Sequence, residues 1–231
     1  MNNSTQIDKI LDYKFKDKSL LTQALTHPSI KASKERSKNN ITYERLEFLG
    51  DSIVSFVISE KLYKDFSDYS EGQLSKLKMF LVCGNTMAKI ANKMNIGAHM
   101  IMDNGEETMG GRSNPKNLEN TLEAICAAIY LDSKDYEIIK NIILKLWQEF
   151  INPDNLILHD PKTTLQEILH EKFQKTPRYE LISSTGAAHD LLFKIHVIVD
   201  GIEPSSGEGK TRKAAEKQAA LAMLKHLNII T

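Results

Sequence analysis

The sequence predicts two domains, an all-α N-terminal domain followed by an α+β C-terminal domain whose elements run in the order αβββα. Three observations favour this arrangement. Apolar residues recur at helical spacing through most of residues 1–151, Pro153 and Pro161 then bracket a short interruption, and strand-like alternation follows between two further helical stretches. A chain of 231 residues is long enough for two domains. We therefore expect a helical domain at 1–151, a linker at 152–160 and an α+β domain at 161–229.

Helical spacing of apolar residues identifies the elements of the N-terminal domain. It predicts helices at residues 7–11, 20–25, 46–62, 74–94, 118–131 and 138–150. Residues 31–40 are charged and rich in Ser and Asn without an apolar period, so we expect a loop there. Residues 99–115 contain Gly105, Gly110 and Gly111, which predicts irregular structure.

The C-terminal domain has a different pattern. Residues 162–175 and 211–227 read as helices, the second with a side rich in Ala and Leu. Residues 178–184, 191–200 and 202–207 read as strands, in which Phe193, Ile195, Val197 and Val199 alternate with other residues and Ile198 breaks the alternation. Two helices that cover one face of a three-stranded sheet are expected.

An acidic stripe opens the helix predicted at 46–62. On a helix that turns by about 100° per residue, Glu44, Glu47 and Asp51 fall within an arc of roughly 60°, opposite an apolar side. Beyond Asp51 the helix is apolar nearly all round, which is typical of a helix buried among others. Burial and mutual repulsion raise the pKa of such carboxylates unless a cation compensates, and hard divalent cations prefer oxygen ligands.

A second helix, at residues 117–132, also begins with oxygen-bearing side chains and becomes almost wholly apolar. Asn120 and Glu123 are neighbours on one of its faces, and small residues at 124, 127 and 128 allow another helix to approach closely. If the two helices pack together, Glu47 and Asp51 converge with Asn120 and Glu123. The alternative is a solvated acidic face, in which the acids of the first turn meet the positive end of the helix dipole.

Composition bounds the class of protein. The 30 basic and 30 acidic residues give a formal net charge of zero, so bulk charge does not indicate a nucleic-acid partner. Cys83 and Cys126 lie in apolar helical patterns and suit no disulfide framework, which favours free thiols in a reducing compartment. The first residues lack the apolar core of a signal peptide, and no apolar run approaches the ~20 residues that cross a bilayer. We expect a cytoplasmic protein without a membrane partner.

Several motifs together resemble the ribonuclease III family of double-strand-specific endoribonucleases. The run Glu-Arg-Leu-Glu-Phe-Leu-Gly-Asp at 44–51 is similar to the family's signature, and similar stretches follow the family's order at 23–29, 71–75, 82–86 and 122–124. Residues 160–227 resemble a double-stranded-RNA-binding domain. The resemblance covers nearly the whole chain.

This resemblance implies phosphodiester hydrolysis in double-stranded RNA by a homodimer, with 5′-phosphate and 3′-hydroxyl products. The usual family substrates are ribosomal RNA precursors and structured messenger RNAs. Asp51 and Glu123 match the catalytic pair, and together with Glu47 they match positions that bind Mg²⁺, for which Mn²⁺ is a possible substitute. Glu44 and Glu71 match acidic positions that line the cleavage site. The cation would activate water and neutralise charge on the scissile phosphate.

One position departs from the family pattern. Asn120 stands where the family has Asp, so the expected metal ligands are Glu47, Asp51, Asn120 and Glu123. An amide oxygen is a legitimate ligand for Mg²⁺, but the loss of one negative charge weakens cation affinity. Glu119 points about 100° away on the helix and is not expected to substitute.

Basic residues at the start of the last predicted helix suit RNA phosphates, because the free N–H groups of a helix N-terminus also favour anions. The family has a further basic residue near the position of Glu216. A loop at 186–189 resembles the one that enters a minor groove, and side chains of the first helix could reach 2′-hydroxyls in the next. The expected RNA-binding residues are Gln166, Glu167, His189, Lys210, Arg212, Lys213 and Lys217. The alternative is a solvated charge run at a helix cap.

Two other functions remain open. The neutral side chain of Asn120 would suit a double-stranded-RNA-binding regulator that does not cleave. The helical domain could also have a structural or protein-interaction role, with RNA merely a tether. Loss of cleavage in an Asp51→Asn or Glu123→Gln variant, with duplex binding kept, would distinguish an enzyme from the regulator and from the structural role.

Overall fold

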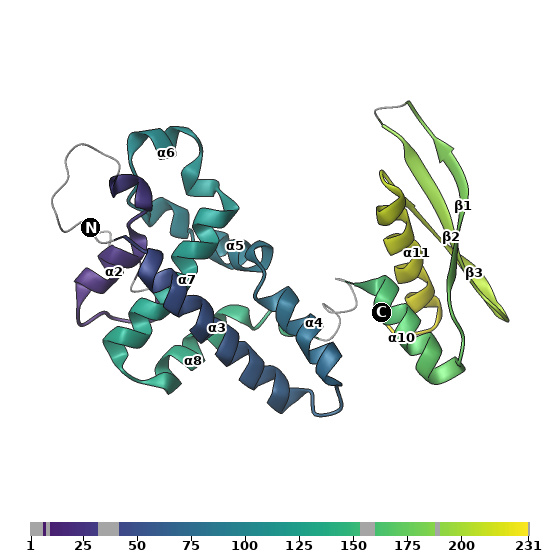
Figure 1. The fold of residues 1–231 in the computed structure, drawn as a ribbon, viewed down its shortest axis with the longest axis horizontal. Helices are drawn as coiled ribbons and strands as arrows, with labels where there is room; N and C mark the ends of the chain where they lie inside the picture. Colours follow the sequence, from purple (N-terminus) through teal and green to yellow (C-terminus); the bar gives the residue numbers. More distant parts are fainter. Residues whose placement is uncertain (1–6, 8–9, 32–41, 153–159, 188–189, 231) are drawn as a thin grey trace. The chain divides into compact units, whose positions relative to one another are not determined.

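The computed structural model describes residues 7, 10–31, 42–152, 160–187 and 190–230, which form two compact units (Figure 1). Unit 1 spans Met1–Ile151 and unit 2 spans Asn152–Thr231. The described helices of unit 1 are α2 (Lys18–Leu25), η1 (Pro28–Lys31), α3 (Glu44–Asp65), α4 (Glu71–Leu81), α5 (Gly84–Lys93), η2 (Ile96–His99), α6 (Asn104–Thr108), η3 (Gly111–Ser113), α7 (Pro115–Ser133) and α8 (Tyr136–Trp147). Among the described helices, none has the length and apolar character required to cross a membrane.

Helix α7 is the centre of unit 1. All of its residues from Thr121 to Ile129 are buried, and α2, α3, α5 and α8 pack against it. The local sequence sets its start: the Oδ1 atom of Asn114 accepts a hydrogen bond from the backbone N–H of Lys116 (2.9 Å), and Pro115 occupies the first turn. The predicted helix at 118–131 is confirmed, and it is three residues longer at its N-terminal end.

Helices α3 and α7 meet backbone to backbone. A Cβ atom added to Gly50 would lie 1.9 Å from the carbonyl oxygen of Glu123, so only a residue without a side chain fits at this crossing. Asp51 follows Gly50 directly, and Glu47 lies one turn before it. The crossing therefore brings the acidic ends of the two helices to the same place.

One expectation for α3 is wrong for the single chain. The apolar circumference beyond Asp51 predicted burial on all sides, yet Phe56 and Tyr63 are 59% and 75% exposed, and Phe48 is 80% exposed. The buried side of α3 carries other residues, among them Val54 and Leu62, which face the core of unit 1. On the other side Phe56 meets only the ring of Tyr136 on α8, at 5.6 Å between centroids, and within the described residues this side of α3 stays largely exposed.

The prediction of one continuous helix at 74–94 is also wrong. The helical conformation is interrupted between α4 and α5 at Val82 and Cys83, where Cys83 has an extended backbone and occupies the N-cap position of α5. Helical spacing persists across the break because both helices turn apolar sides to the same core. The irregular structure expected at 99–115 is confirmed, with one short helix, α6, and the turn η3 inside it.

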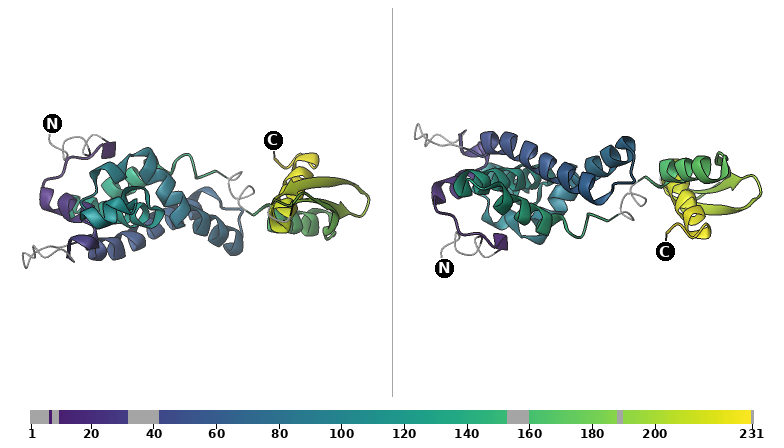
Figure 2. Two further views of the ribbon diagram at one scale, coloured as in Figure 1. Left: turned by 90° about the horizontal axis from the view of Figure 1, so that it is seen from above. Right: turned by 90° about the horizontal axis from the view of Figure 1, so that it is seen from below.

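Unit 2 has the order α10 (Pro161–Phe173), β1 (Arg178–Thr185), β2 (Leu192–Val199), β3 (Ile202–Gly209) and α11 (Arg212–His226), which confirms the αβββα prediction. The strands form an antiparallel sheet in the order β1-β2-β3, and both helices lie on one face of it (Figures 1 and 2). Burial alternates along the end of β2, where Ile195, Val197 and Val199 are buried and Ile198 is partly exposed, so Ile198 is an apolar residue on the other face of the sheet. The two helices and the sheet share one core, formed by Leu165, Leu169, Ile195, Val197, Val199, Ala215, Ala219, Ala220, Met223 and Leu224.

Candidate functional site

Glu123 is the most deeply buried carboxylate of the α3–α7 crossing, with 5% of its surface exposed. Burial, together with the nearby charge of Asp51 and smaller contributions from Glu119 and Glu47, raises the pKa of Glu123 to about 8. The coupling to Asp51 and Glu47 joins residues of two helices that are more than 70 positions apart in the sequence. The structure thus brings these three carboxylates together.

Glu47 belongs to the same cluster. Burial is the main cause that raises its pKa, with smaller contributions from Glu119, Glu44 and Asp51, while Lys116 opposes the rise. Glu44, one turn earlier on α3, is exposed, and one of its carboxylate oxygens accepts a hydrogen bond from the hydroxyl of Thr42 (2.7 Å). Glu44 therefore lies at the rim of the cluster rather than inside it.

Asn120 lies one turn before Glu123 on α7. Its Oδ1 atom is buried and has no hydrogen-bond partner among the described residues. A buried amide oxygen without a partner costs about 1–3 kcal/mol, so it suits an atom that binds something else. In the part of the chain that is described, it is the one side-chain amide oxygen that is buried without a partner.

These residues fit a hard divalent cation in their chemistry but do not form a closed cage. Within the described residues, no three His, Cys, Asp or Glu side chains are gathered in a geometry that could hold a metal ion alone. Mg²⁺ usually keeps several waters and takes one or two carboxylates together with substrate phosphates. The pair Asp51 and Glu123, with the unpartnered oxygen of Asn120, matches that incomplete kind of site.

Sequence reasoning missed Lys116. Its ammonium forms an ion pair with Glu119 (3.1 Å), and its charge lowers the pKa of both Glu47 and Glu123. Helical spacing could have revealed it, because Lys116 precedes Glu119 by three residues and Glu123 by seven, on one side of α7. Lys116 therefore offsets part of the cluster's negative charge.

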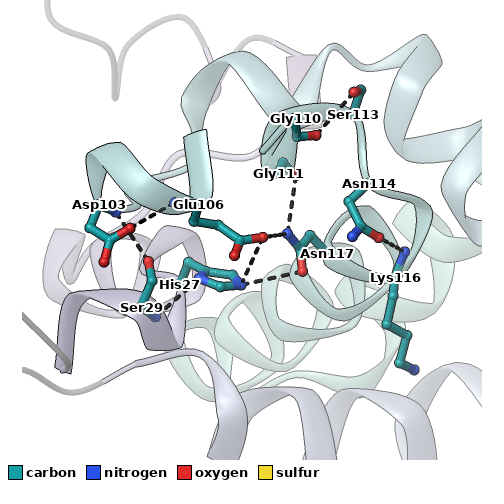
Figure 3. A network of polar contacts seen from close by, with 10 residues as sticks. All are labelled: His27, Ser29, Asp103, Glu106, Gly110, Gly111, Ser113, Asn114, Lys116 and Asn117. Atoms are coloured by element: carbon teal, nitrogen blue, oxygen red, sulfur yellow. Dashed lines mark hydrogen bonds and ion pairs between the residues drawn. The ribbon is translucent and has the colours of Figure 1, made fainter. Parts of the chain in front are cut away.

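A network of polar contacts holds the start of α7 in place (Figure 3). The Nδ1 atom of His27 accepts a hydrogen bond from the backbone of Ser29 (3.0 Å), so the neutral ring carries its proton on Nε2, 3.3 Å from Oδ1 of Asn117. The amide of Asn117 in turn donates to Glu106 (2.7 Å) and to the carbonyl of Gly111 (3.1 Å). Ser29 is a local partner of His27, whereas Asn117 lies 90 residues away and no sequence pattern pointed to it.

Glu71 is not part of the acidic cluster in a single chain. It starts α4 and lines a hollow with residues near the C-terminal end of α3, including Ser59 and Leu62. Ser59 is eight residues beyond Asp51, about 12 Å along the helix. The structure therefore brings together Glu47, Asp51, Asn120 and Glu123, and it leaves Glu71 apart.

In unit 2, two of the expected RNA-binding residues are paired with acids. Lys210 contacts Asp190 (2.9 Å) and Arg212 contacts Glu216 (3.2 Å). Glu216 also pairs with Lys162 at 2.6 Å, which sequence reasoning did not single out. Lys213 and Gln166 are exposed, Lys217 and Glu167 are half-buried, and His189 lies outside the described residues.

The comparisons with known proteins agree with this architecture. Residues 17–148 match the family model described as ribonuclease-III-like, and residues 161–227 match that of the double-stranded RNA binding motif. The chain is 46% identical to ribonuclease 3 of Rickettsia bellii (strain OSU 85-389) over 230 residues, which cover 100% of both proteins. It is 44% identical to ribonuclease 3 of Rickettsia prowazekii (strain Madrid E) over 227 residues, or 98% of this chain and 100% of the relative.

A solved structure supports the assignment of unit 1. The nuclease domain of ribonuclease III from Campylobacter jejuni superposes with a TM-score of 0.59 and 41% identity, covering 66% of this chain and 99% of that one. The sequence matches, the fold of unit 1 and the order of the two domains all support the same family. The chain therefore belongs to the ribonuclease III family and is an endoribonuclease of that family with a double-stranded-RNA-binding domain.

Proposed function

We propose that this protein hydrolyses phosphodiester bonds in double-stranded RNA with the help of a divalent cation, Mg²⁺ or in its place Mn²⁺, and leaves 5′-phosphate and 3′-hydroxyl ends. The observation that carries the proposal is the burial of Glu123 beside Asp51 at the crossing of α3 and α7. Asp51 is exposed, but a buried carboxylate beside a second negative charge is costly at such a place unless a cation compensates.

Four residues would hold the cation: Glu47, Asp51, Asn120 and Glu123. When bound, the cation supplies Lewis-acid activation of water and neutralises charge at the scissile phosphate. Glu123 must lose its proton to serve as a ligand, and its pKa of about 8 means that metal binding and proton release are coupled near neutral pH. Asp51 and Glu123 are the proposed catalytic pair, with Glu44 at the rim of the cleavage site.

Unit 2 would hold the RNA duplex through its phosphates and riboses. Thr211 caps α11 by accepting a hydrogen bond from the backbone of Ala214 (3.1 Å), which leaves the first N–H groups of the helix beside Arg212 and Lys213. To reach phosphate, Lys210 and Arg212 exchange their present acidic partners for RNA oxygens. We propose the remaining contacts at Gln166, Glu167, His189 and Lys217.

We propose that the enzyme is a homodimer, built on the exposed face of α3. Phe48, Phe56 and Tyr63 fall within roughly 80° around the helix, and a second copy would cover all three in a symmetric contact. Glu71 would then lie in reach of RNA that passes between the two copies. One solved structure of the Campylobacter jejuni nuclease domain (TM-score 0.57, 41% identity) is described as showing structural flexibility in a region involved in dimer formation.

The dimer has a direct test. A Phe48→Asp variant places a charge within this contact, so sedimentation should show a monomer where the unaltered chain shows a dimer. An Ile138→Asp variant changes another apolar residue, 38% exposed on α8, and it serves as the control. A dimer that survives Phe48→Asp would rule out this face.

The biological substrates that we propose are ribosomal RNA precursors and structured messenger RNAs in the cytoplasm. Support for the location comes from Cys83 and Cys126, which are both free thiols, as expected in a reducing compartment. The comparison of RNA from cells with and without the protein tests the substrates, because uncut precursors should accumulate in its absence.

The neutral side chain of Asn120 favours a second candidate, a regulator that binds duplex RNA without cutting it. Purified protein incubated with long duplex RNA and Mg²⁺ or Mn²⁺ separates the two. We expect cleavage by the unaltered chain and its loss in Asp51→Asn, with duplex binding largely kept. Binding without cleavage by the unaltered chain, over a full range of metal concentrations, would favour the regulator.

A further inference from the structure

The acidic cluster is divided between the N-terminal halves of two helices. Glu47 and Asp51 lie on α3, whereas Asn120 and Glu123 lie on α7. The close approach at Gly50 sets the distance between the two helices where they cross. It does not set the crossing angle, because two rigid helices can still turn about a single point of contact. A second contact is therefore needed to hold the two halves of the cluster in register.

His27 provides a second link between the starts of α3 and α7. It lies between α2 and η1, and its side chain is 12% exposed. On the side of α3, its ring packs edge-on against the ring of Tyr43 at 5.7 Å between centroids, and the backbone N–H of Tyr43 donates to the carbonyl of Thr26 (3.0 Å). On the side of α7, Nε2 of His27 lies 3.3 Å from Oδ1 of Asn117. The link therefore joins the residue directly before α3 to the first turn of α7.

The hydrogen bond between His27 and Asn117 has a fixed direction. Because the backbone N–H of Ser29 donates to Nδ1 of His27 (3.0 Å), the neutral ring can donate only from Nε2. The Nδ2 atom of Asn117 donates to Glu106 (2.7 Å) and to the carbonyl of Gly111 (3.1 Å), which leaves its oxygen to accept from His27 (Figure 3). Donor and acceptor are thus both held by further partners, so neither side chain turns freely.

The link lies far enough from the crossing to control the angle. Tyr43 precedes Gly50 by seven residues and Asn117 precedes Glu123 by six, which is about 10 Å and 9 Å along the chain.

Glu47 and Asn120 lie between the link and the crossing, each about 4.5 Å from the crossing along its helix. A change of about 10° in the angle would therefore move them by about 0.8 Å relative to each other. Mg²⁺ demands near-ideal octahedral geometry, whereas Ca²⁺ accepts longer and more variable distances to oxygen. A shift of this size therefore disfavours Mg²⁺ more than Ca²⁺.

We propose that His27 is a positioning residue, which links the start of α7 to the start of α3 and thereby fixes the angle at which the two halves of the metal site meet. This inference rests on the proposed function, since it concerns the same metal site. His27 acts through Asn117 and Tyr43 and not as a ligand. Its effect is a preference of the site for Mg²⁺ over the larger Ca²⁺.

The test measures the dissociation constants of Mg²⁺ and Ca²⁺ for the full-length protein without RNA. Each constant is obtained from the displacement of Mn²⁺, which is followed by the electron paramagnetic resonance signal of the free Mn²⁺ ion. In a His27→Asn variant the shorter side chain does not reach the position of Nε2. The constant for Mg²⁺ should therefore rise roughly three- to tenfold, and the constant for Ca²⁺ should change by less than about twofold.

A His27→Gln variant tests rescue by a conservative change. Gln is longer than Asn and carries an N–H donor near the position of Nε2, so it can restore the bond to Asn117. Both replacements lose the ring that packs against Tyr43, and neither adds a charge near the cluster. The difference between them therefore reports the bond to Asn117, and His27→Gln should recover most of the affinity for Mg²⁺.

A matched control is Tyr13→Phe. Tyr13 is also in unit 1 and donates a hydrogen bond to Asp132 (2.6 Å), which lies nine residues beyond Glu123 on α7, about 14 Å away. This variant also removes a hydrogen bond between a distant residue and α7, and it should leave the ratio of the two dissociation constants unchanged. It separates the positioning of the metal site from a general loosening of the domain.

An unchanged ratio of the two constants in His27→Asn would overturn the proposal, and so would a His27→Gln variant that behaves like His27→Asn. Should these variants fail to fold, hydrogen exchange in the unaltered chain decides. Coupling between two sites is reciprocal, so saturating Mg²⁺ should slow exchange of the backbone N–H of Tyr43 by the same factor, roughly three- to tenfold. Equal exchange rates with and without Mg²⁺ would refute the role of His27.

Duplex cleavage by the unaltered chain is measured in parallel, which distinguishes two kinds of failure. Cleavage with Mg²⁺ but no effect of His27 on the two constants sinks this inference alone. The absence of both metal binding and cleavage sinks the proposed function as well.

Discussion

Replacement of Glu123 by Gln should stabilise unit 1 when no metal is present. Gln keeps the size and hydrogen-bonding capacity of the protonated acid and removes the charge that burial and Asp51 disfavour. A pKa that moves from 4.5 to about 8 corresponds to roughly 5 kcal/mol between the two protonation states. Relaxation and water entry reduce such penalties, so we expect a gain of about 2–4 kcal/mol at alkaline pH.

The pH dependence has a definite sign. Because the pKa of Glu123 is raised in the folded state, its stabilising contribution is present below the unfolded value of 4.5 and is lost as pH rises through about 8. The unaltered chain should therefore lose stability between these two values, and Glu123→Gln should lose much less. Below the unfolded pKa of 4.5 the two proteins should be nearly equal.

The assay can follow unit 1 by itself. Trp147 is the single tryptophan of the chain, is fully buried, and belongs to unit 1, so its fluorescence reports urea unfolding of this unit within the intact protein. Mg²⁺ at about 1,000 times its dissociation constant should then reverse the ranking at alkaline pH, since a ligand at that concentration adds about 4.1 kcal/mol to the stability of the form that binds it. Equal stability of the two proteins at every pH in chelator would refute the claim that Glu123 is held in a desolvated, acidic surrounding.

Three further changes probe other parts of the molecule. A Gly50→Ala variant places a Cβ atom 1.9 Å from the carbonyl oxygen of Glu123 and forces the helices apart. Thermal melts should therefore show a loss of about 1–3 kcal/mol in stability, and the rate of cleavage should fall about 100-fold. Unchanged melts and cleavage would speak against the close crossing. An Asn120→Asp variant should lower the Mg²⁺ concentration at half-maximal cleavage, since ligand charge sets cation affinity, and an unchanged requirement would speak against Asn120 as a ligand. Replacement of Arg212 and Lys213 by Ala should weaken duplex binding. The slope of log affinity against log salt concentration should decrease in magnitude by about 1 for each phosphate that is no longer neutralised. An unchanged slope would mean that the RNA binds elsewhere.

The helices and strands that form the site could be predicted because their signals are local. The apolar periods of α3 and α7, and the alternation in β2, depend on residues a few positions apart. Small residues on α7 indicated a close helix contact, but the crossing itself depends on Gly50 of α3, where no pattern marked the point of contact. The two helices that carry Asp51 and Glu123 were therefore predictable from local patterns, but the point at which they cross was not.

Features that depend on distant partners were not predictable from the sequence. The contact between Nε2 of His27 and Oδ1 of Asn117 joins residues 90 positions apart, and the hydrogen bond from the indole of Trp147 to the carbonyl of Leu81 joins residues 66 apart. The exposed face that carries Phe56 and Tyr63 was wrongly predicted to be buried, because an apolar pattern does not say whether the same chain supplies the cover.

The most direct test is a crystal structure of the protein with Mn²⁺, whose anomalous scattering locates the ion. We predict a peak about 2–2.5 Å from carboxylate oxygens of both Asp51 and Glu123, with the amide oxygen of Asn120 turned toward it. Ordered carboxylates of Asp51 and Glu123 with no peak between them, in crystals that bind Mn²⁺ elsewhere, would contradict this prediction.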